Sequence, residues 1–412
     1  MIVRIDPFNA AGEITAPPSK SYAHRYIIAA FLAGKPCVIK NAGDSDDVRV
    51  TVSAVKSLGA VVEKRDGDVI FRGRKKVARA TVDCGESGST LRFLTPVCAA
   101  LGTDAEFICK GRLAERPMGS IANALEGHGA TVAGLKVSGK LDCGRYFLDA
   151  SVSSQFVSGL LFALSALDGE SEIVLTGKRV SSGYIDITLD VLRCFGVSVH
   201  DVESGFKIKG GYDPPETVSV EGDWSGAAFP LAIGALTGSV TVNNLTYPSL
   251  QADSVFLGIL KKFGAEVRVG GGKITVSRAY LRSAGEIDCE NSPDIAQAVA
   301  AVAAFAEGKT RLTGVSRLKL KESDRIGAII NTLFTCGVRA EFDGEGIIVY
   351  GGKPKGCVFS GGKDHRTVMS AAIIAAAADG CSEITDTEYT AKSYPAFFED
   401  IKLLGGKPYG LF

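Results

Sequence analysis

The amino-acid sequence predicts an α/β (α+β) protein of two lobes, each built from three strand–helix–strand–helix–hairpin repeats. The first observation is a phrase that recurs six times: an amphipathic helix, a glycine, a short alternating strand, a glycine-rich turn and a second strand. The second is an Ala-rich helix before each copy, apolar on almost every face. The third is the 49 glycines in 412 residues, well above the usual share of about 7%, which fits a fold with many turns.

A glycine marks the same point in every repeat, between the amphipathic helix and the hairpin. Successive markers lie 67 to 73 residues apart: Gly59, Gly129, Gly196, Gly264, Gly337 and Gly405. The hairpin sequences alternate polar and apolar residues, as 57–73 (SLGAVVEKRDGDVIFRG) does. Alternation of this kind indicates half-buried strands.

Each repeat has two kinds of helix. Segments such as 24–34 (HRYIIAAFLAG) and 227–238 (AAFPLAIGALTG) are apolar nearly all round, which predicts buried helices. Segments such as 47–60 and 254–267 are amphipathic, so we expect them nearer the surface.

The repeat also predicts how the chain divides. The strand at 1–5 (MIVRI) belongs to no repeat of its own, while the last repeat ends early. If the first strand completes the last repeat, the second lobe is 1–16 plus 222–412 and the first lobe is 17–221. The chain then crosses between lobes near 16–18 and 221–223, and two crossing strands side by side form a hinge.

Composition excludes several classes of protein. Lys plus Arg equals Asp plus Glu at 46 each, which argues against a binder of nucleic acid or of a membrane surface. No apolar run approaches the roughly 18–20 residues of a membrane span, and the start lacks the layout of a signal peptide. The ten cysteines include no Cys-x-x-Cys pair. We therefore expect reduced, mostly buried cysteines, no metal site, and a cytoplasmic monomer.

The buried helices begin with polar and often charged residues. Comparable positions are Lys20, Ser89, Ser154, Ser225, Asp294 and His365. Equivalent helices of one lobe should point the same way, so their free N–H groups and dipoles gather on one face and favour anions. If two such faces oppose each other across the hinge, the cleft suits a substrate with phosphates and carboxylates.

Three further segments add charge. Arg112 and Arg116 precede Pro117 in what reads as a loop entering a helix, and Lys392 precedes Pro395. The segment KLKESDR places Lys321 and Arg325 four residues apart, and on a helix the two would share a face.

Nine segments together resemble the successive motifs of the 5-enolpyruvylshikimate-3-phosphate synthase family, within the enolpyruvyl transferases. They are PPSKSYAHR, GESGSTLRFL, RLAERPMG, SSQFVSGLL, SGYIDIT, EGDWSGAA, LKLKESDR, DHRTVMS and AKSYP, in family order over residues 17–395. The resemblance implies two lobes of three repeats. It also implies transfer of the enolpyruvyl group of phosphoenolpyruvate to the 5-hydroxyl of shikimate 3-phosphate, with release of phosphate, in the shikimate pathway to chorismate and aromatic amino acids.

The resemblance also implies site residues, carried over by motif position. For shikimate 3-phosphate these are Lys20, Ser21, Arg25, Ser153, Ser154, Gln155, Ser181, Tyr184, Asp294 and Lys321. For phosphoenolpyruvate they are Lys20, Gly88, Arg116, Gln155, Arg325, Arg366 and Lys392. The chain departs from the family at Glu86, where many members have Asn. A carboxylate there would repel the substrate unless it is turned away or paired.

Charge and proton transfer together define the expected chemistry. The two substrates bring roughly five to six negative charges, and seven cations match them without a metal or other cofactor: Lys20, Arg25, Arg116, Lys321, Arg325, Arg366 and Lys392. Our candidate for the proton donor to the methylene carbon is Glu322, with Asp294 accepting the hydroxyl proton and Lys20 and Lys392 as alternative carriers. Sensitivity to the inhibitor glyphosate is a further expectation.

Three alternatives deserve comparison. The sibling family that transfers enolpyruvyl to a UDP-sugar typically has Lys-Asn where this chain has Lys20-Ser21, and a catalytic Cys just before its Arg-Pro. The nearest cysteine here, Cys109, lies on an expected strand. A six-unit clamp around DNA would need basic, amphipathic helices. A catalytically inactive homologue would have lost charged motif residues that this chain retains.

Overall fold

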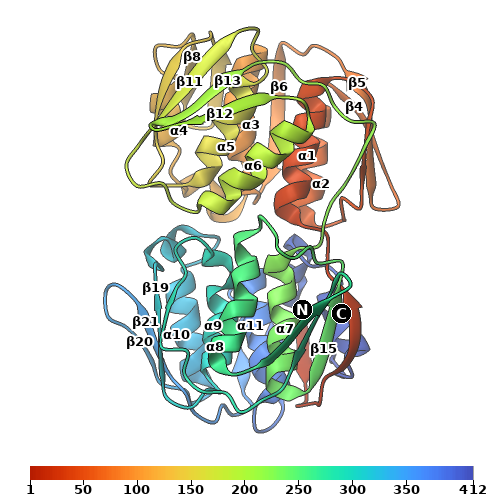
Figure 1. Ribbon diagram of the computed structural model, residues 1–412, viewed down its shortest axis with the longest axis vertical. Coiled ribbons are helices and arrows are strands. Elements are labelled where there is room, and N and C mark those ends of the chain that lie inside the picture. The colour runs from red at the N-terminus through yellow and green to blue at the C-terminus, as the bar shows by residue number, and fades with distance from the viewer. Residues whose placement is uncertain (412) are drawn as a thin grey trace. The chain divides into compact units, whose positions relative to one another are not determined.

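The computed structural model describes residues 1–411, and it is built from six four-stranded sheets (Figure 1). One sheet illustrates all of them: β10 (Arg145–Asp149), β11 (Glu170–Thr176), β13 (Gly205–Lys209) and β12 (Ser198–Val202) lie in that order. β10 and β11 are parallel, and the other pairs are antiparallel. Along the chain the order is strand, helix, strand, helix, hairpin, so the predicted repeat and fold class are confirmed.

The chain forms two compact units: unit 1 is residues 1–19 with those from 221 onward, and unit 2 is residues 20–220. The first repeat of unit 2 contains α1 (Lys20–Ala33), β3 (Cys37–Lys40), α2 (Asp46–Ser57), β4 (Ala60–Arg65) and β5 (Asp68–Arg74), opened by β14 (Thr217–Ser219). The second contains β6 (Arg79–Gly85), α3 (Gly88–Leu101), β7 (Asp104–Cys109), the 3-10 helix η1 (Gly111–Glu115), α4 (Gly119–Leu125), β8 (Ala130–Ala133) and β9 (Lys136–Gly139). The third adds α5 (Ser154–Leu164) and α6 (Ser182–Cys194) to β10–β13.

Unit 1 contains the other three repeats. The fourth has β2 (Ala11–Thr15), α7 (Trp224–Thr237), β15 (Ser239–Asn243), η2 (Ala252–Val255), α8 (Phe256–Phe263), β16 (Glu266–Gly270) and β17 (Lys273–Ser277). The fifth has β18 (Glu286–Asp288), η3 (Pro293–Ile295), α9 (Ala296–Ala303), β19 (Lys309–Thr313), η4 (Ser316–Leu320), α10 (Arg325–Thr335), β20 (Ala340–Phe342) and β21 (Ile347–Tyr350). The sixth has β22 (Val358–Phe359), α11 (His365–Ala377), β23 (Ser382–Thr385), η5 (Thr387–Lys392), α12 (Phe397–Leu403) and β24 (Tyr409–Leu411).

The N-terminal residues supply two strands to unit 1. Strand β1 (Ile2–Ile5) lies between β23 and β24 and is antiparallel to both, so it completes the sheet of the sixth repeat. Strand β2 lies parallel to β15 and opens the fourth repeat. Between β2 and α1 the chain meets the segment after β14: Pro18 bridges Gly222, and the N–H of Ser19 donates to the carbonyl of Glu221. Both ends of the chain therefore help to build unit 1.

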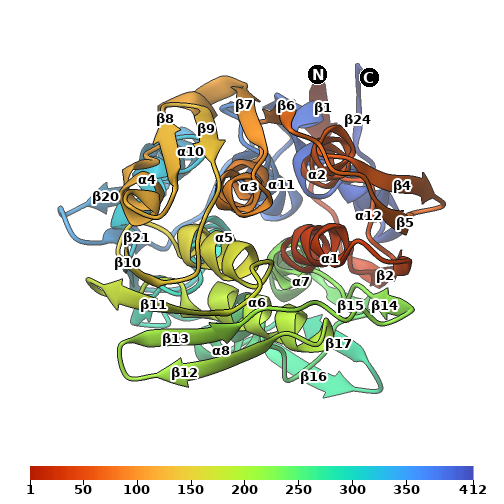
Figure 2. The same ribbon diagram turned by 90° about the horizontal axis from the view of Figure 1, so that it is seen from above.

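The Ala-rich helices form the core of each unit. In unit 2, α1, α3 and α5 pack together inside the three sheets, as the view along their axes shows (Figure 2). In unit 1, α7, α9 and α11 do the same, and every residue of α7 is buried. A helix that is apolar all round can bury every face only in such a central position. The burial of these helices therefore follows from their sequences.

The six marker glycines end the amphipathic helices in a left-handed conformation. Their φ values are 98° at Gly59, 82° at Gly129, 75° at Gly196, 98° at Gly264, 83° at Gly337 and 96° at Gly405. Glycine reaches positive φ without a Cβ clash, which makes it the usual residue just after a helix. The repeat spacing therefore reports where the chain turns from helix to hairpin.

Close packing of α3 on α5 predicts a stability change at Gly159. A Cβ there would lie 2.4 Å from the carbonyl oxygen of Arg92, so Gly159→Ala should lower the free energy of unfolding by about 1–3 kcal/mol. The control is Gly258→Ala on α8, where a Cβ meets nothing within 4 Å and helix propensity should add about 0.5–1 kcal/mol. Urea unfolding measures both, and equal effects of the two changes would contradict this packing.

Candidate functional site

Polar side chains cap the buried helices of unit 2 at their N-termini. Ser87 Oγ accepts the N–H of Thr90 at the start of α3, and Ser153 Oγ accepts that of Gln155 at the start of α5, each at 3.3 Å. Part of the polar pattern in the sequence is therefore ordinary N-capping. The remaining N–H groups and the helix dipoles still favour an anion at these ends.

Three predicted phosphoenolpyruvate residues come together at the start of α3. A Cβ on Gly88 would lie 2.8 Å from Arg116 Nη1 and 3.6 Å from Gln155 Oε1. Gln155 is fixed from both ends, because its Nε2 donates to Ser89 Oγ (3.0 Å) and its Oε1 accepts from Arg92 Nη1 (2.8 Å). Gly88 thus lets backbone approach a cation and an amide in a space that a side chain would fill.

Arg92 was missed as a site residue. Besides Gln155, its Nη1 contacts Ser153 Oγ at 3.4 Å, and its guanidinium stacks on the ring of Phe156, 4.9 Å from the ring centre. Arg92 is 4% exposed. The signal was available in the sequence, because an arginine in an otherwise apolar buried helix needs polar partners.

Arg25 joins residues from three helices of unit 2. Its Nη1 donates to the carbonyl of Ser21 (2.8 Å), Nη2 to the carbonyl of Tyr184 (2.9 Å) and Nε to Thr188 Oγ1 (2.7 Å). The guanidinium also faces the ring of Phe93 on α3, 5.1 Å from its centre. Burial lowers the pKa of Arg25 to about 10, with partial compensation from Tyr184. Arg25 remains charged at neutral pH and fixes Ser21 and Tyr184 relative to each other.

The other predicted residues of unit 2 occupy helix starts. Lys20 is the first residue of α1, and its Nζ forms a 2.8 Å ion pair with Asp47 of α2. Ser154 is buried at the start of α5. Ser181 precedes α6 with a φ of 51°, a left-handed conformation that is uncommon for serine.

Glu86 lies at the turn between β6 and α3. Its side chain is half-buried, and its carboxylate lies against Gly111 at the start of η1: a Cβ on Gly111 would be 2.7 Å from Glu86 Oε1. The carboxylate therefore packs against the backbone that leads into the Arg116 segment.

In unit 1, Arg325 contacts three carboxylates at once. Its Nη1 lies 2.9 Å from Asp294 Oδ1, its Nη2 lies 2.9 Å from Glu322 Oε2, and its Nε lies 2.9 Å from Asp364 Oδ2. Arg325 is 1% exposed. Burial alone would lower the pKa of Arg325, but Asp364, Glu322 and Asp294 raise it above its usual value. Burial alone would raise the pKa of Asp364, but Arg325 and His365 lower it below its usual value.

Asp294 is shared by three cations. Its Oδ1 accepts from Lys321 Nζ (3.3 Å) as well as from Arg325, and its Oδ2 lies 3.4 Å from Arg366 Nη2. The expected helical pairing of Lys321 with Arg325 is wrong. Lys321 follows η4 in an extended conformation, whereas α10 begins at Arg325 after the N-cap Asp324. The two cations meet at Asp294 and not along a helix face.

Asp253, which the sequence did not single out, lies behind this group. It is 3% exposed and accepts a hydrogen bond from Ser225 Oγ, while the carbonyl of Ser225 accepts from Arg366 Nη1 (3.4 Å). Burial, followed by the neighbouring charge of Asp294, raises the pKa of Asp253 to about 7. Ser225 therefore connects Asp253, a carboxyl with a raised pKa, to Arg366.

Lys392 is buried at the end of η5 and is 5% exposed. Within residues 1–411, no three His, Cys, Asp or Glu side chains are grouped so as to hold a metal ion. No helix in the described part of the chain is long and apolar enough to cross a membrane. All ten cysteines are unpaired, five of them buried and two exposed.

Comparison with known proteins identifies the family. The profile of EPSP synthase (3-phosphoshikimate 1-carboxyvinyltransferase) matches residues 6–401. The chain belongs to this family. A Clostridium kluyveri relative described as 3-phosphoshikimate 1-carboxyvinyltransferase is 38% identical over 98% of this chain and 97% of its own. A Thermococcus kodakarensis relative of the same description is 39% identical over 95% and 97%. The solved EPSP synthase of Acinetobacter baumannii superposes with a TM-score of 0.81 at 26% identity, over 99% of this chain and 100% of that one.

Membership of the EPSP synthase family confirms the resemblance drawn from the nine motifs. It also separates the chain from two of the alternatives considered, the sibling family that acts on a UDP-sugar and a DNA clamp. Cys109, on which the first comparison turned, ends strand β7 as expected.

The raised pKa of Asp253 predicts a pH-dependent stability. A folded-state pKa near 7, against about 3.9 unfolded, means that the folded chain binds more protons between those values. The contribution of Asp253 to the free energy of unfolding is therefore full below pH 4, and it is lost as pH rises through 7. Asp253→Asn keeps an acceptor for Ser225 and has no carboxyl to titrate. Its free energy of unfolding should therefore rise, relative to that of the unchanged protein, by at least about 1.4 kcal/mol when the pH is changed from 4.5 to 8. Urea unfolding at both pH values measures this gain. A constant difference between the two proteins would refute the pKa assignment.

Proposed function

We propose that this protein transfers the enolpyruvyl group of phosphoenolpyruvate to the 5-hydroxyl of shikimate 3-phosphate and releases phosphate. Family membership and the retention of every charged motif residue support the assignment. The observation that carries most weight is the Arg325 group, because one buried cation holds Asp294 and Glu322, the two carboxylates proposed for proton transfer.

We assign the two substrates to the residues given by the motifs. Shikimate 3-phosphate would contact Ser21, Arg25, Ser153, Ser154, Gln155, Ser181 and Tyr184 of unit 2, and Asp294 and Lys321 of unit 1. Phosphoenolpyruvate would contact Gly88, Arg116 and Gln155 of unit 2, and Arg325, Arg366 and Lys392 of unit 1, with Lys20 serving both substrates. Helix N-termini and guanidinium groups suit the phosphate and carboxylate groups of these molecules.

The proposed reaction is an addition followed by an elimination. The 5-hydroxyl oxygen bonds to C2 of phosphoenolpyruvate, the hydroxyl proton goes to Asp294, and Glu322 gives a proton to the methylene carbon. The tetrahedral adduct then loses phosphate from C2 and a proton from the new methyl group, which restores the double bond. Glu322 can take that proton back, so one carboxyl serves as acid and then as base. Lys20 and Lys392 are alternative proton carriers.

The salt bridges in this group support the role proposed for Asp294. Asp294 contacts Lys321, Arg325 and Arg366, and three cations stabilise its ionised form, as a base requires. Glu322 forms an ion pair with Arg325 through its Oε2. The ten unpaired cysteines support action in a reducing compartment, which we take to be the cytoplasm.

The direct test is release of phosphate. We expect release only when shikimate 3-phosphate and phosphoenolpyruvate are both present. Glu322→Gln should bind both substrates and lower turnover by about 10²-fold or more, since general acid–base groups contribute about 10²–10⁴. The control is Glu345→Gln, because the side chain of Glu345 is 88% exposed on a hairpin turn. Phosphate release from one substrate alone would overturn the assignment, and normal turnover in Glu322→Gln would remove Glu322 from it.

Gly88 should govern the response to glyphosate. This inhibitor carries a carboxylate and a phosphonate, as phosphoenolpyruvate carries a carboxylate and a phosphate, but it is longer. The methyl group of Gly88→Ala would displace Arg116 Nη1, from which it would lie 2.8 Å. The methyl group should also press harder on the longer inhibitor than on the substrate. Overpacking costs about 1–3 kcal/mol, which should weaken glyphosate by roughly 5- to 150-fold and phosphoenolpyruvate by less.

Inhibition and Michaelis constants of both proteins test this expectation. Gly119→Ala is the matched control, because it also lies at a helix start in unit 2 and a Cβ there meets nothing within 4 Å. Parallel changes in the two constants of Gly88→Ala, or a starting protein indifferent to millimolar glyphosate, would contradict the assigned role.

A further inference from the structure

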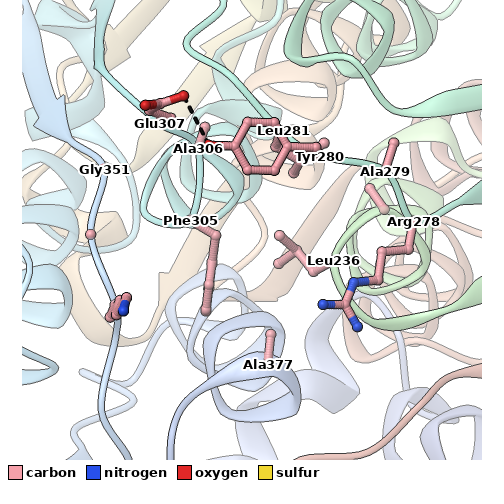
Figure 3. Close-up of a pocket in the computed structure, with 13 residues that line it drawn as sticks. Leu236, Arg278, Ala279, Tyr280, Leu281, Phe305, Ala306, Glu307, Gly351 and Ala377 are labelled. Atoms are coloured by element: carbon pink, nitrogen blue, oxygen red, sulfur yellow. Dashed lines mark hydrogen bonds between the residues drawn. The ribbon is translucent and has the colours of Figure 1, made fainter.

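We propose that unit 1 has a second small-molecule site, at the C-terminal ends of α7 and α11, that takes a single-ring aromatic carboxylate. Two neighbouring cavities of about 450 and 300 Å³ lie there. They share Leu236, Arg278 and Ala377 in their linings. Figure 3 shows these three residues in the larger cavity. Both volumes fall in or near the range of ligand pockets. None of the residues proposed for catalysis lines either cavity.

The internal repeat identifies the side chains of unit 2 that stand at the positions of the cavity-lining residues of unit 1. Helices α1 and α7 end alike: Gly34 donates its N–H to the carbonyl of Ala30, and Gly238 donates to that of Gly234. Three residues before each glycine stands Phe31 in unit 2 and Ala235 in unit 1. Ala235 lines the larger cavity.

Sheet register gives a second pair of counterparts. Phe206 pairs with Ile173 in unit 2, and Val3 pairs with Ile384 at the same place in unit 1. Six residues further on stand Tyr212 and Asn9. The preceding residues confirm this alignment, because Gly211 N–H donates to the carbonyl of Ser165 after α5 and Phe8 N–H to that of Ala376 in α11. Asn9 lines the smaller cavity.

In unit 2 the two aromatic rings close this end of the helix bundle. Tyr212 Oη donates to the carbonyl of Phe162 in α5 at 3.1 Å. The guanidinium of Arg74, the last residue of β5, lies 5.4 Å from the centre of the Phe31 ring. A ring, a hydroxyl donor and an arginine therefore fill the space together.

Unit 1 keeps the arginine and lacks both rings. Arg278 directly follows β17, as Arg74 ends β5, but Ala235 and Asn9 replace the aromatic residues. Within residues 1–411 the side chains of Arg278 and of the nearby Lys353 make no ion pair, and both residues are exposed. The space thus offers apolar walls at Leu236 and Phe305, with the cations Arg278 and Lys353 in its lining. The carboxylate of Glu307 lines it as well and accepts a hydrogen bond from Tyr280 Oη at 2.9 Å (Figure 3).

These features define the ligand by its chemistry. An aromatic ring would replace the missing side chains against the apolar walls. A hydroxyl on the ring can donate to carbonyls at the helix C-termini, as Tyr212 does in unit 2. A carboxylate would pair with Arg278, because a guanidinium binds carboxylates through parallel N–H groups.

The test uses 4-hydroxybenzoate as the probe, in a ligand-detected NMR titration of the full chain. We expect saturation with a Kd of about 1 mM or lower, a usual affinity for a molecule of about ten heavy atoms. Arg278→Ala should weaken binding at least about fivefold, and so should replacing the probe with the neutral 4-hydroxybenzyl alcohol. The matched control is Arg268→Ala, since Arg268 is an exposed arginine on the adjoining strand β16.

Variants that restore the unit 2 side chains locate the site. Asn9→Tyr and Ala235→Phe should each weaken the probe at least about tenfold, and Asn9→Tyr should leave the melting temperature unchanged or higher. Binding that is undiminished in Asn9→Tyr would place the probe elsewhere, for example at the helix N-termini of the catalytic residues, and would overturn the proposal. Absence of saturation by about 20 mM probe would overturn it as well. If Ala235→Phe fails to fold, Asn9→Tyr and Arg278→Ala still decide the outcome.

Discussion

The chemistry of unit 1 depends on one constraint: a buried guanidinium must have its charge and its donors matched. Arg325, at 1% exposure, meets this constraint with three carboxylates from three segments of chain, namely Asp294 of η3, Glu322 before α10 and Asp364 at the N-cap of α11. Moving a charged side chain from water into the protein interior costs several kcal/mol of free energy unless oppositely charged partners surround it. The three carboxylates are therefore held close together, and two of them are the groups that we propose for proton transfer.

Much of this architecture could be predicted from the sequence because it rests on periodicity. The positive φ of Gly59 and its five counterparts requires glycine, so the repeat appears directly in the sequence. Helices such as α7 are apolar on all sides and can only be buried. The polar residues at their N-termini then predict where charge collects, and Gly88, Arg116 and Gln155 do lie together at the start of α3.

What the sequence could not predict is pairing between residues distant in the chain. From the sequence, seven cations were counted as free to bind the charges of the substrates. In the structure Lys20 pairs with Asp47. Asp294 is shared by Lys321, Arg325 and Arg366. Asp253 was missed for the same reason, since its place beside the site comes from its contact with Ser225, 28 residues away in the chain. The helical reading of KLKESDR failed because Asp324 caps α10 and places Lys321 outside that helix.

The central claim is that Arg325 acts on catalysis by holding Glu322, and a double-mutant cycle on kcat/KM measures this most directly. The cycle compares Arg325→Lys, Glu322→Gln and the double variant, with phosphate release as the readout. Residues in contact within one salt-bridge network usually couple by about 0.5–3 kcal/mol. The account predicts that the fold-loss in kcat/KM of the double variant is at least about fivefold smaller than the product of the two fold-losses of the single variants. Multiplicative effects would contradict it, because the two side chains would then act independently.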